Sequence, residues 1–189
     1  GPVRWDVSLN FAKNINEVVK LTEGINELTT EQARSGRAWI QHRVGEAYSS
    51  IAGFKQLQID GQKVYDDFGF PVRDNNVVLL GKGVAPITGG ISNDFTYKNF
   101  NFGFLIDYKF GGSVYSGTNA IMYSTGVHEN SVNGRDGGLA LQGVDESGEQ
   151  KTFNVDPLLM EDWYWMYGTY ISENVVYSSD YLKLRQLIF

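Results

Sequence analysis

Residues 97–110 read YKNFNFGFLIDYKF, and their strict alternation constrains the fold more than any other feature of the chain. Every second side chain is aromatic or aliphatic, namely Phe100, Phe102, Phe104, Ile106, Tyr108 and Phe110. A period of two predicts an extended strand with one apolar face and one largely polar face. Ten steps of about 3.3 Å make a strand about 33 Å long, enough to cross the apolar band of an outer-membrane β-barrel when tilted. A strand of a soluble β-sandwich with one buried face is equally compatible with this stretch.

Three further segments predict long strands. Residues 3–13 place Trp5, Val7, Leu9 and Phe11 on one side, and Asp6, Ser8 and Asn10 on the other. Further strands are expected at residues 90–97 and 181–189. The short joint between residues 97 and 101 predicts a β-hairpin with Asn99 near the turn, because Asn tolerates a left-handed backbone conformation. These segments together predict an antiparallel sheet.

The segments between the long strands are less regular. Residues 22–37 are polar, and we expect a loop with one helical turn there. One or two strands are expected in residues 39–61, with residues 49–59 the best candidate. Residues 62–90 are interrupted by Gly and Pro and should be mostly loop.

A short helix is expected in residues 116–124, with Ser116 or Thr118 as its N-cap. Residues 145–148 read DESG, which is consistent with the turn of a hairpin. No composition shift marks a linker. The whole pattern predicts an all-β fold of antiparallel strands with long loops and one short helix, and residues 1–189 as one domain.

Composition excludes several classes of protein. The chain has 16 Lys and Arg against 22 Asp and Glu, a formal net charge of −6, and no basic block, so we expect no nucleic-acid partner. It has no Cys, which excludes disulfides, thiolate metal sites and Cys nucleophiles. Aromatic residues form 14% of the chain and Gly occurs 22 times, which is typical of an all-β protein with many turns. No apolar run approaches the 18 residues of a transmembrane helix.

No motif for bond chemistry is present. His42 and His128 are the only histidines, without the spacing of a zinc site, and no G-x-S-x-G motif marks a nucleophile. The glycine-rich run at residues 81–90 lacks the Lys-[Ser/Thr] of a phosphate loop and contains Pro86, which removes a backbone donor. We therefore expect no enzyme, no catalytic residue, no metal site and no cofactor.

The run DWYWMYGTY at residues 162–170 is the candidate ligand-binding segment. It reads as a loop with five aromatic residues, and such rings can stack on sugar rings or peptide side chains. Trp163, Tyr164 and Trp165 are the candidate contacts. The alternative is that the same rings only pack a loop or form an aromatic girdle at a membrane interface.

The order of several motifs resembles the SusC/RagA family of TonB-linked outer-membrane receptors. A Leu-Gly…Pro…Gly-Gly turn, a Phe-Thr-Tyr-Lys-Asn-Phe run and a Gly-Gly-x-Val-Tyr-x-Gly-Thr run match that family at Leu80-Gly81, Pro86, Gly89-Gly90, residues 95–100 and residues 111–118. Similar segments are VRWDVSLNFAKNINEVVKL (residues 3–21), VGEAYSSIAGFK (residues 44–55, with Ala47 where Pro is usual), NGRDGG (residues 133–138) and VVYSSDYLKLRQLIF (residues 175–189). The resemblance covers nearly the whole chain in the family's order.

The resemblance implies that residues 1–189 are the C-terminal part of a transmembrane β-barrel, without the plug domain and the last strands of such receptors. It implies a parent in the Gram-negative outer membrane that imports oligosaccharides or peptides. The implied partners are TonB, a SusD-like surface lipoprotein, the cargo and the lipid bilayer. Apolar side chains would face lipid, and Asp6, Ser8, Asn10, Asp107 and Lys109 the lumen.

A second hypothesis is a soluble β-sandwich module that binds glycans through the aromatic segment. About six strands cannot close a barrel of 22, and open strand edges are not tolerated in lipid. The chain alone would need another cover for its apolar side chains. A sheet packed on itself would provide that cover, as the sandwich hypothesis expects.

Overall fold

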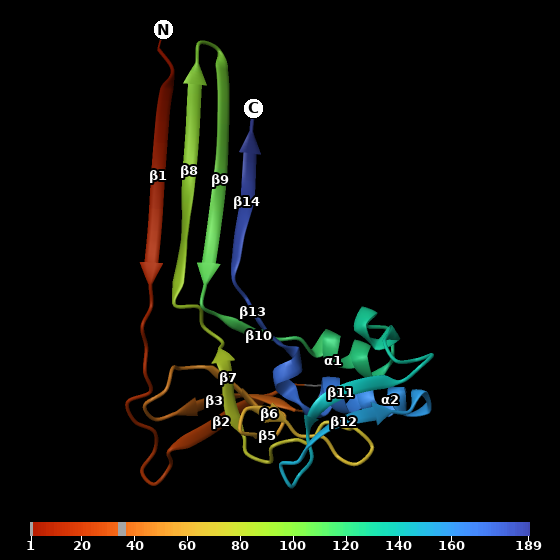
Figure 1. Cartoon of the computed structure of the whole chain (residues 1–189). Coiled ribbons are helices and arrows are strands. Elements are labelled where there is room, and N and C mark those ends of the chain that lie inside the picture. The colour runs from red at the N-terminus through yellow and green to blue at the C-terminus, as the bar shows by residue number, and fades with distance from the viewer. Residues whose placement is uncertain (1, 34–36) are drawn as a thin grey trace.

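The computed structural model describes residues 2–33 and 37–189, and it consists of a long antiparallel sheet that stands on a compact lobe (Figure 1). Four strands form the sheet in the order β1-β8-β9-β14. Their bounds are Arg4–Lys13 (β1), Ile87–Tyr97 (β8), Phe100–Phe110 (β9) and Tyr181–Ile188 (β14). The antiparallel, mostly-β architecture is as predicted, although β8 begins three residues earlier than the expected start at residue 90.

The register of the strands sorts the alternating side chains onto two faces. Trp5 pairs with Phe95, which in turn pairs with Phe102. Directly paired residues of antiparallel strands point to the same face of a sheet. One side, called here the apolar face, therefore carries Trp5, Val7, Leu9, Phe11, Ile91, Phe95, Phe102, Phe104, Ile106, Tyr108, Leu182, Leu184 and Leu187. The opposite, polar face carries Asp6, Ser8, Asn10, Asp107 and Lys109, which confirms that these five share one side.

A two-residue turn joins β8 and β9. Tyr97 pairs with Phe100, so the turn consists of Lys98 and Asn99, and the predicted hairpin is confirmed. The positive backbone angle lies at Lys98 (φ 53°) and not at Asn99, the residue expected to tolerate it. This turn and both termini lie at the end of the sheet that is far from the lobe (Figure 1).

Two long insertions between the sheet strands build the lobe. The first, residues 14–86, connects β1 to β8 and contains β2 (Glu27–Gln32), β3 (Ala38–Arg43), β4 (Ser50–Gly53), β5 (Gln58–Ile59), β6 (Gln62–Lys63) and β7 (Val78–Lys82). Four of these strands form a second sheet in the order β2-β3-β4-β7. The expected strand region of residues 49–59 thus holds two short strands rather than one long one.

The second insertion, residues 111–180, connects β9 to β14. It contains β10 (Ser113–Tyr115), α1 (Gly117–Ser124), η1 (Glu129–Val132), β11 (Leu139–Val144), β12 (Gln150–Val155), η2 (Pro157–Leu159), α2 (Met160–Trp165), η3 (Met166–Tyr170), η4 (Ser172–Val175) and β13 (Val176–Ser178). Helix α1 lies where the sequence predicted it, and its N-cap Ser116 accepts a hydrogen bond from the Asn119 N–H at 3.1 Å. The predicted hairpin at residues 145–148 joins β11 to β12.

Two sequence predictions are wrong in the lobe. The segment at residues 22–37 was expected to be a loop, but it contains β2, which pairs with β3; residues 34–36 of that segment lie outside the described residues. The segment at residues 62–90 is mostly loop, as predicted, although it also contains β6, β7 and the start of β8. The aromatic run at residues 162–170, expected to be a loop, is helical. Pairing with β3 orders β2, and packing in the core of the lobe orders the aromatic helix.

Buried contacts hold the two insertions together. Ser172 is fully buried, and its hydroxyl donates to the Arg37 carbonyl oxygen and accepts from the Phe54 N–H. A single parallel bridge links Val64 to Val144. The hydrophobic core of the lobe contains Ala120, Tyr123, Val155, Met160, Trp163, Tyr164 and Val175. The lobe is therefore one folded body made from two chain segments.

Within residues 2–33 and 37–189, no helix is both long enough and apolar enough to span a lipid bilayer.

Candidate functional site

The apolar face of the long sheet exposes many large apolar side chains. Trp5 is 59% exposed, Leu9 66% and Leu182 68%. In the part of the chain that the structure describes, neither a helix nor a second sheet lies over this face (Figure 1). Contiguous apolar surface of this kind marks a site of contact with lipid or with another protein.

One polar side chain interrupts the apolar face and is paired there. Asn93 is less than a tenth exposed, and its Oδ1 accepts a hydrogen bond from the Trp5 indole N–H at 3.1 Å. The Trp5 ring also stacks on Phe95, with 5.8 Å between ring centroids. An amide on a lipid-facing surface needs such a partner, because hydrocarbon offers none.

The predicted aromatic site does not form one surface. Trp163 is 6% exposed, and its indole N–H donates to the Gly69 carbonyl oxygen at 3.0 Å. The Tyr164 hydroxyl donates to the carbonyl oxygens of Asn130 and Asn133. Both rings therefore pack the lobe, and their polar groups hydrogen-bond to main-chain carbonyl oxygens. Trp165 points elsewhere and is 40% exposed.

A local cap begins the helical segment that carries these rings. Asp156 accepts a hydrogen bond from the Leu158 N–H at 2.8 Å, and Pro157 occupies the first helical position. Asp-Pro is a sequence signal for a helix start, so this helix could have been predicted. The turn at residues 166–170 widens to a π-helical turn, which brings Tyr167 against Trp163 at 5.2 Å between ring centroids.

Burial changes the acidity of two tyrosines in this segment. It raises the pKa of Tyr167 to about 12, with further contributions from the neighbouring tyrosines, above all Tyr123. Burial also raises the pKa of Tyr164. Removal of these protons would place a phenolate in a poorly solvated site, so both hydroxyls stay neutral around pH 7.

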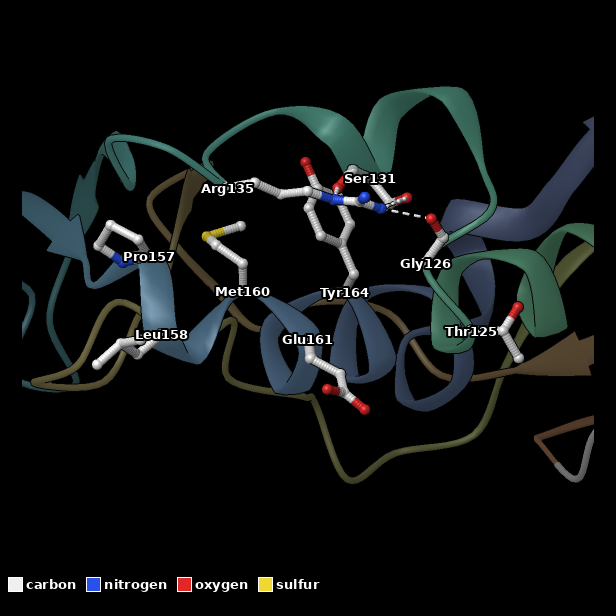
Figure 2. A pocket seen from close by; sticks show the side chains of 9 residues that line it. All are labelled: Thr125, Gly126, Ser131, Arg135, Pro157, Leu158, Met160, Glu161 and Tyr164. Atoms are coloured by element: carbon white, nitrogen blue, oxygen red, sulfur yellow. Dashed lines mark hydrogen bonds between the residues drawn. The ribbon is translucent and has the colours of Figure 1, made fainter.

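A pocket of about 510 Å³ opens beside α2 (Figure 2). Tyr164 and Glu161 line it from the helix, Ser131 lines it from η1, and Arg135 lines it from the turn that follows η1. Arg135 donates from Nε to the Ser131 carbonyl oxygen at 2.8 Å and from Nη2 to the Gly126 carbonyl oxygen. The guanidinium thereby holds the loop closed on itself. Of the three predicted contacts, only Tyr164 borders this pocket.

The described residues contain no group of three or more His, Asp or Glu side chains placed to bind a metal ion. The acidic turn between β11 and β12 is internally paired. The Lys151 ammonium, followed by the Ser147 hydroxyl, holds the pKa of Asp145 well below its usual range. The acidic turn is thus a structural element of the hairpin between β11 and β12.

Comparisons with known proteins show partial similarity to two receptors. No family model matches it. Over 130 residues, which cover 59% of this chain, it is 28% identical to the TonB-dependent receptor SusC of Bacteroides thetaiotaomicron. Over 41 residues, which cover 22% of this chain, it is 42% identical to the TonB-dependent receptor P39 of Formosa agariphila. The matches span 12% and 4% of the lengths of these two receptors.

The fold defines the class of the molecule as mostly β, built from antiparallel sheets, with a long sheet that leaves one face uncovered. Within that class, the two similarities relate the chain, over part of its length, to the TonB-dependent receptors.

Proposed function

We propose that this chain is part of an outer-membrane TonB-dependent receptor of the SusC/RagA kind, and that its long sheet is a section of the transmembrane β-barrel. The apolar face is the observation that supports this proposal most directly. Its side chains alternate with a polar face, as in barrels whose strands separate lipid from lumen. Strands β8 and β9 each have 11 residues, the length that a tilted membrane strand needs.

The outer strands of the sheet support the same proposal. β1 and β14 each pair with one neighbour among the described residues. Edges of this length would be paired with further strands in a closed barrel. We accordingly propose that residues 1–189 form a partial domain from the C-terminal part of the barrel, and that the plug domain and last strands belong to the rest of the parent protein.

The connections suggest an orientation. Outer-membrane barrels have short periplasmic turns and long extracellular loops. The two-residue turn at Lys98 and Asn99 would then face the periplasm. The lobe of residues 14–86 and 111–180 would face the outside of the cell.

In this proposal, the parent imports oligosaccharides or peptides with energy relayed by TonB, and a SusD-like lipoprotein meets its outer surface. The chain itself performs no bond chemistry and needs no cofactor. The soluble β-sandwich alternative is not favoured, because a sandwich needs a second layer on the apolar side and the described residues place none there.

Two neighbouring substitutions test the proposal. Leu9→Lys places a charge on the apolar face, and Ser8→Lys places the same charge on the polar face. A cation on the lipid side of a barrel costs about 2–4 kcal/mol near the bilayer centre. We expect Leu9→Lys to lower recovery of the chain with lipid vesicles in flotation and Ser8→Lys to leave it near the unmodified level. A chain that is monodisperse without detergent, with both variants alike, would contradict a membrane role.

A further inference from the structure

Two arginines and two aromatic rings meet on the lobe where the insertions join. The guanidinium carbon of Arg37 lies 4.0 Å from the centre of the Tyr170 ring, and that of Arg73 lies 5.3 Å from the same ring. Trp165 packs on Tyr170, with 4.8 Å between centroids and 54° between ring planes. Arg37, Arg73, Trp165 and Tyr170 are called here the arginine–aromatic cluster.

The two cations have no anionic partner within the described chain. No Asp or Glu oxygen of the described residues lies within 4 Å of either guanidinium. The Arg37 side chain forms no hydrogen bond with a described residue. Arg73 donates from Nη2 to Asn75 Oδ1 at 3.2 Å, whereas its Nη1 is buried and has no hydrogen-bond partner there.

Unused donors of this kind are unusual in a folded protein. A guanidinium carries five N–H donors, and buried charged donors are nearly always hydrogen-bonded. Stacking on Tyr170 and Phe54 explains where the two side chains lie. It does not use the in-plane N–H groups. The cluster therefore carries positive charge that no carboxylate of the described residues neutralises, although the buried Arg73 Nη1 is itself closed to a ligand.

The backbone beneath the cluster is held in place. Ser172 contacts the main chain of Arg37 and Phe54, and the Glu173 N–H donates to the Phe54 carbonyl oxygen at 3.1 Å. The Asp74 N–H, next to Arg73, donates to the Lys55 carbonyl oxygen at 2.9 Å. These bonds fix the spacing of the two arginines before a ligand arrives, which lowers the entropic cost of binding.

We propose that the arginine–aromatic cluster binds the anionic group of an acidic oligosaccharide, a sugar that carries a carboxylate or a sulfate. This inference rests on the proposed function and narrows its cargo class. A planar guanidinium matches the oxygen pair of a carboxylate or sulfate with two parallel hydrogen bonds. The partly exposed Trp165 indole offers an apolar ring face to the C–H groups of the adjoining sugar. An acidic peptide would satisfy the arginines but leave that ring face without a matching partner.

Binding is measured by titration calorimetry on the full chain in micelles of the zwitterionic detergent lauryldimethylamine oxide. The probes are tetragalacturonic acid, its methyl ester, a sulfated galactan tetrasaccharide and tetraglutamate. We expect tetragalacturonic acid to bind at least about tenfold more tightly than its methyl ester, because each hydrogen bond to a charged group contributes about that factor. If the sulfated probe binds as tightly as tetragalacturonic acid, the site accepts both sulfate and carboxylate. If the sulfated probe binds much more weakly, the site is specific for carboxylate.

Four variants locate the binding. Arg37→Gln and Arg73→Gln should each weaken tetragalacturonate binding by about tenfold or more, and Trp165→Ala by several-fold. Arg4→Gln removes the same charge at the far end of the sheet and should leave the dissociation constant unchanged. The near-ultraviolet circular dichroism of each variant checks that the lobe stays folded.

Three results would each overturn the inference. Tetragalacturonic acid and its methyl ester could bind equally tightly, the Arg37 and Arg73 variants could bind as tightly as the unmodified chain, or no acidic sugar could bind at all. Tetraglutamate binding as tight as tetragalacturonate would overturn the sugar assignment. The flotation assay with lipid vesicles is run on the same preparation. If the chain floats with vesicles but does not bind the sugars, only this inference is contradicted. If the chain does not float with vesicles, the proposed membrane function is contradicted.

Discussion

At the scale of single residues, Gly89 shows how close packing shapes the apolar face. It pairs directly with Tyr108 on β9, and the Tyr108 ring crosses it so that the hydroxyl donates to the Asn10 carbonyl oxygen on β1 at 3.3 Å. A Cβ at Gly89 would lie 2.3 Å from the Tyr108 hydroxyl oxygen and 2.4 Å from that carbonyl oxygen. Only glycine leaves room for a tyrosine to bridge three strands here.

Gly89→Ala should therefore destabilise the sheet. The Asn10 oxygen belongs to the main chain and cannot move without separating β1 from β8, so we expect a loss of about 1–3 kcal/mol, as for other overpacked sites. Guanidinium unfolding in micelles measures it. Gly137→Ala is the matched control, because its Cβ meets no atom within 4 Å. Equal stability of the two variants would contradict the close packing of Gly89 against Tyr108 and the Asn10 carbonyl oxygen.

Residue roles were only partly visible in the sequence. The alternation assigned each sheet side chain to a face, and the register agrees for Asp6, Ser8, Asn10, Asp107 and Lys109. The aromatic run identified Trp163, Tyr164 and Trp165 as a group but could not separate the inward pair from the exposed ring. That separation depends on which side of a helix meets the core, and the run was not recognised as helical. Ligand contact by these residues remains a prediction.

At the scale of elements, β14 contains an irregularity that keeps its apolar face continuous. The register shifts between Leu184 and Gln186, so Arg185 is an extra residue in the ladder. Leu184 pairs with Ile106 before the bulge, and Leu187 pairs with Phe104 after it. Without the bulge, Leu187 would move to the polar face. The Arg185 Nε contacts Asp107 Oδ2 at 2.6 Å on the polar side.

Two single deletions in β14 test this explanation. Deletion of Arg185 should give a regular strand with the same apolar face and cost about 1 kcal/mol or less, because one exposed ion pair is lost. Deletion of Lys183 shortens the strand equally but moves Leu184 to the polar face and Arg185 to the apolar face. It should cost about 2–4 kcal/mol in a membrane environment.

The midpoint of guanidinium unfolding in micelles compares the two deletions. Similar midpoints would mean that stability depends little on which β14 side chains point to the apolar face. A larger loss of stability for the Arg185 deletion would indicate that the bulge matters for the ion pair with Asp107 rather than for the apolar face.

Element prediction succeeded where the pattern is long and local. The strands at β1, β9 and β14, the hairpin at Lys98-Asn99 and the helix capped by Ser116 all follow from alternation, turn residues or a cap. β2, β7 and the helical segment at residues 160–170 were not predicted. β2 and β7 are short strands whose order depends on pairing with β3 and β4 rather than on a strong pattern of their own. The helical segment has an Asp-Pro start signal that the aromatic composition obscured.

At the scale of the whole molecule, a sheet with little core supports a lobe with a dense aromatic core. Tyr164 stacks on Tyr123 within that core and Tyr167 meets it edge-on, at 5.9 Å and 5.1 Å between centroids. Tyr65, from the other insertion, also has a pKa raised by burial. The lobe therefore depends on several neutral phenols that alkali can ionise.

Alkaline pH should unfold the lobe before it disrupts the sheet. The pKa of Tyr167 rises from 10.0 to about 12, so between these values the folded chain keeps a proton that the unfolded chain releases. Stability from this group is complete below about pH 10 and is lost as pH rises toward 12. Absorbance at 295 nm and tryptophan fluorescence should change together in that interval, while far-ultraviolet sheet signal in micelles persists.

Tyr167→Phe removes the ionisable group and should shift the alkaline midpoint upward. Tyr48→Phe is the control, because the Tyr48 side chain is 56% exposed and lies outside the core of the lobe. An unchanged midpoint in Tyr167→Phe would assign the alkaline transition to other groups.

The amino-acid sequence by itself determined the long antiparallel strands and the two faces of their sheet, because side chains alternate with period two whatever surrounds the strand. Tertiary structure alone decided how residues 14–86 and 111–180 combine into one lobe. That association uses contacts between residues more than a hundred positions apart, such as Phe54 with Ser172, and local sequence carries no signal for them. The meeting of Arg37 and Arg73 at one tyrosine ring has the same origin.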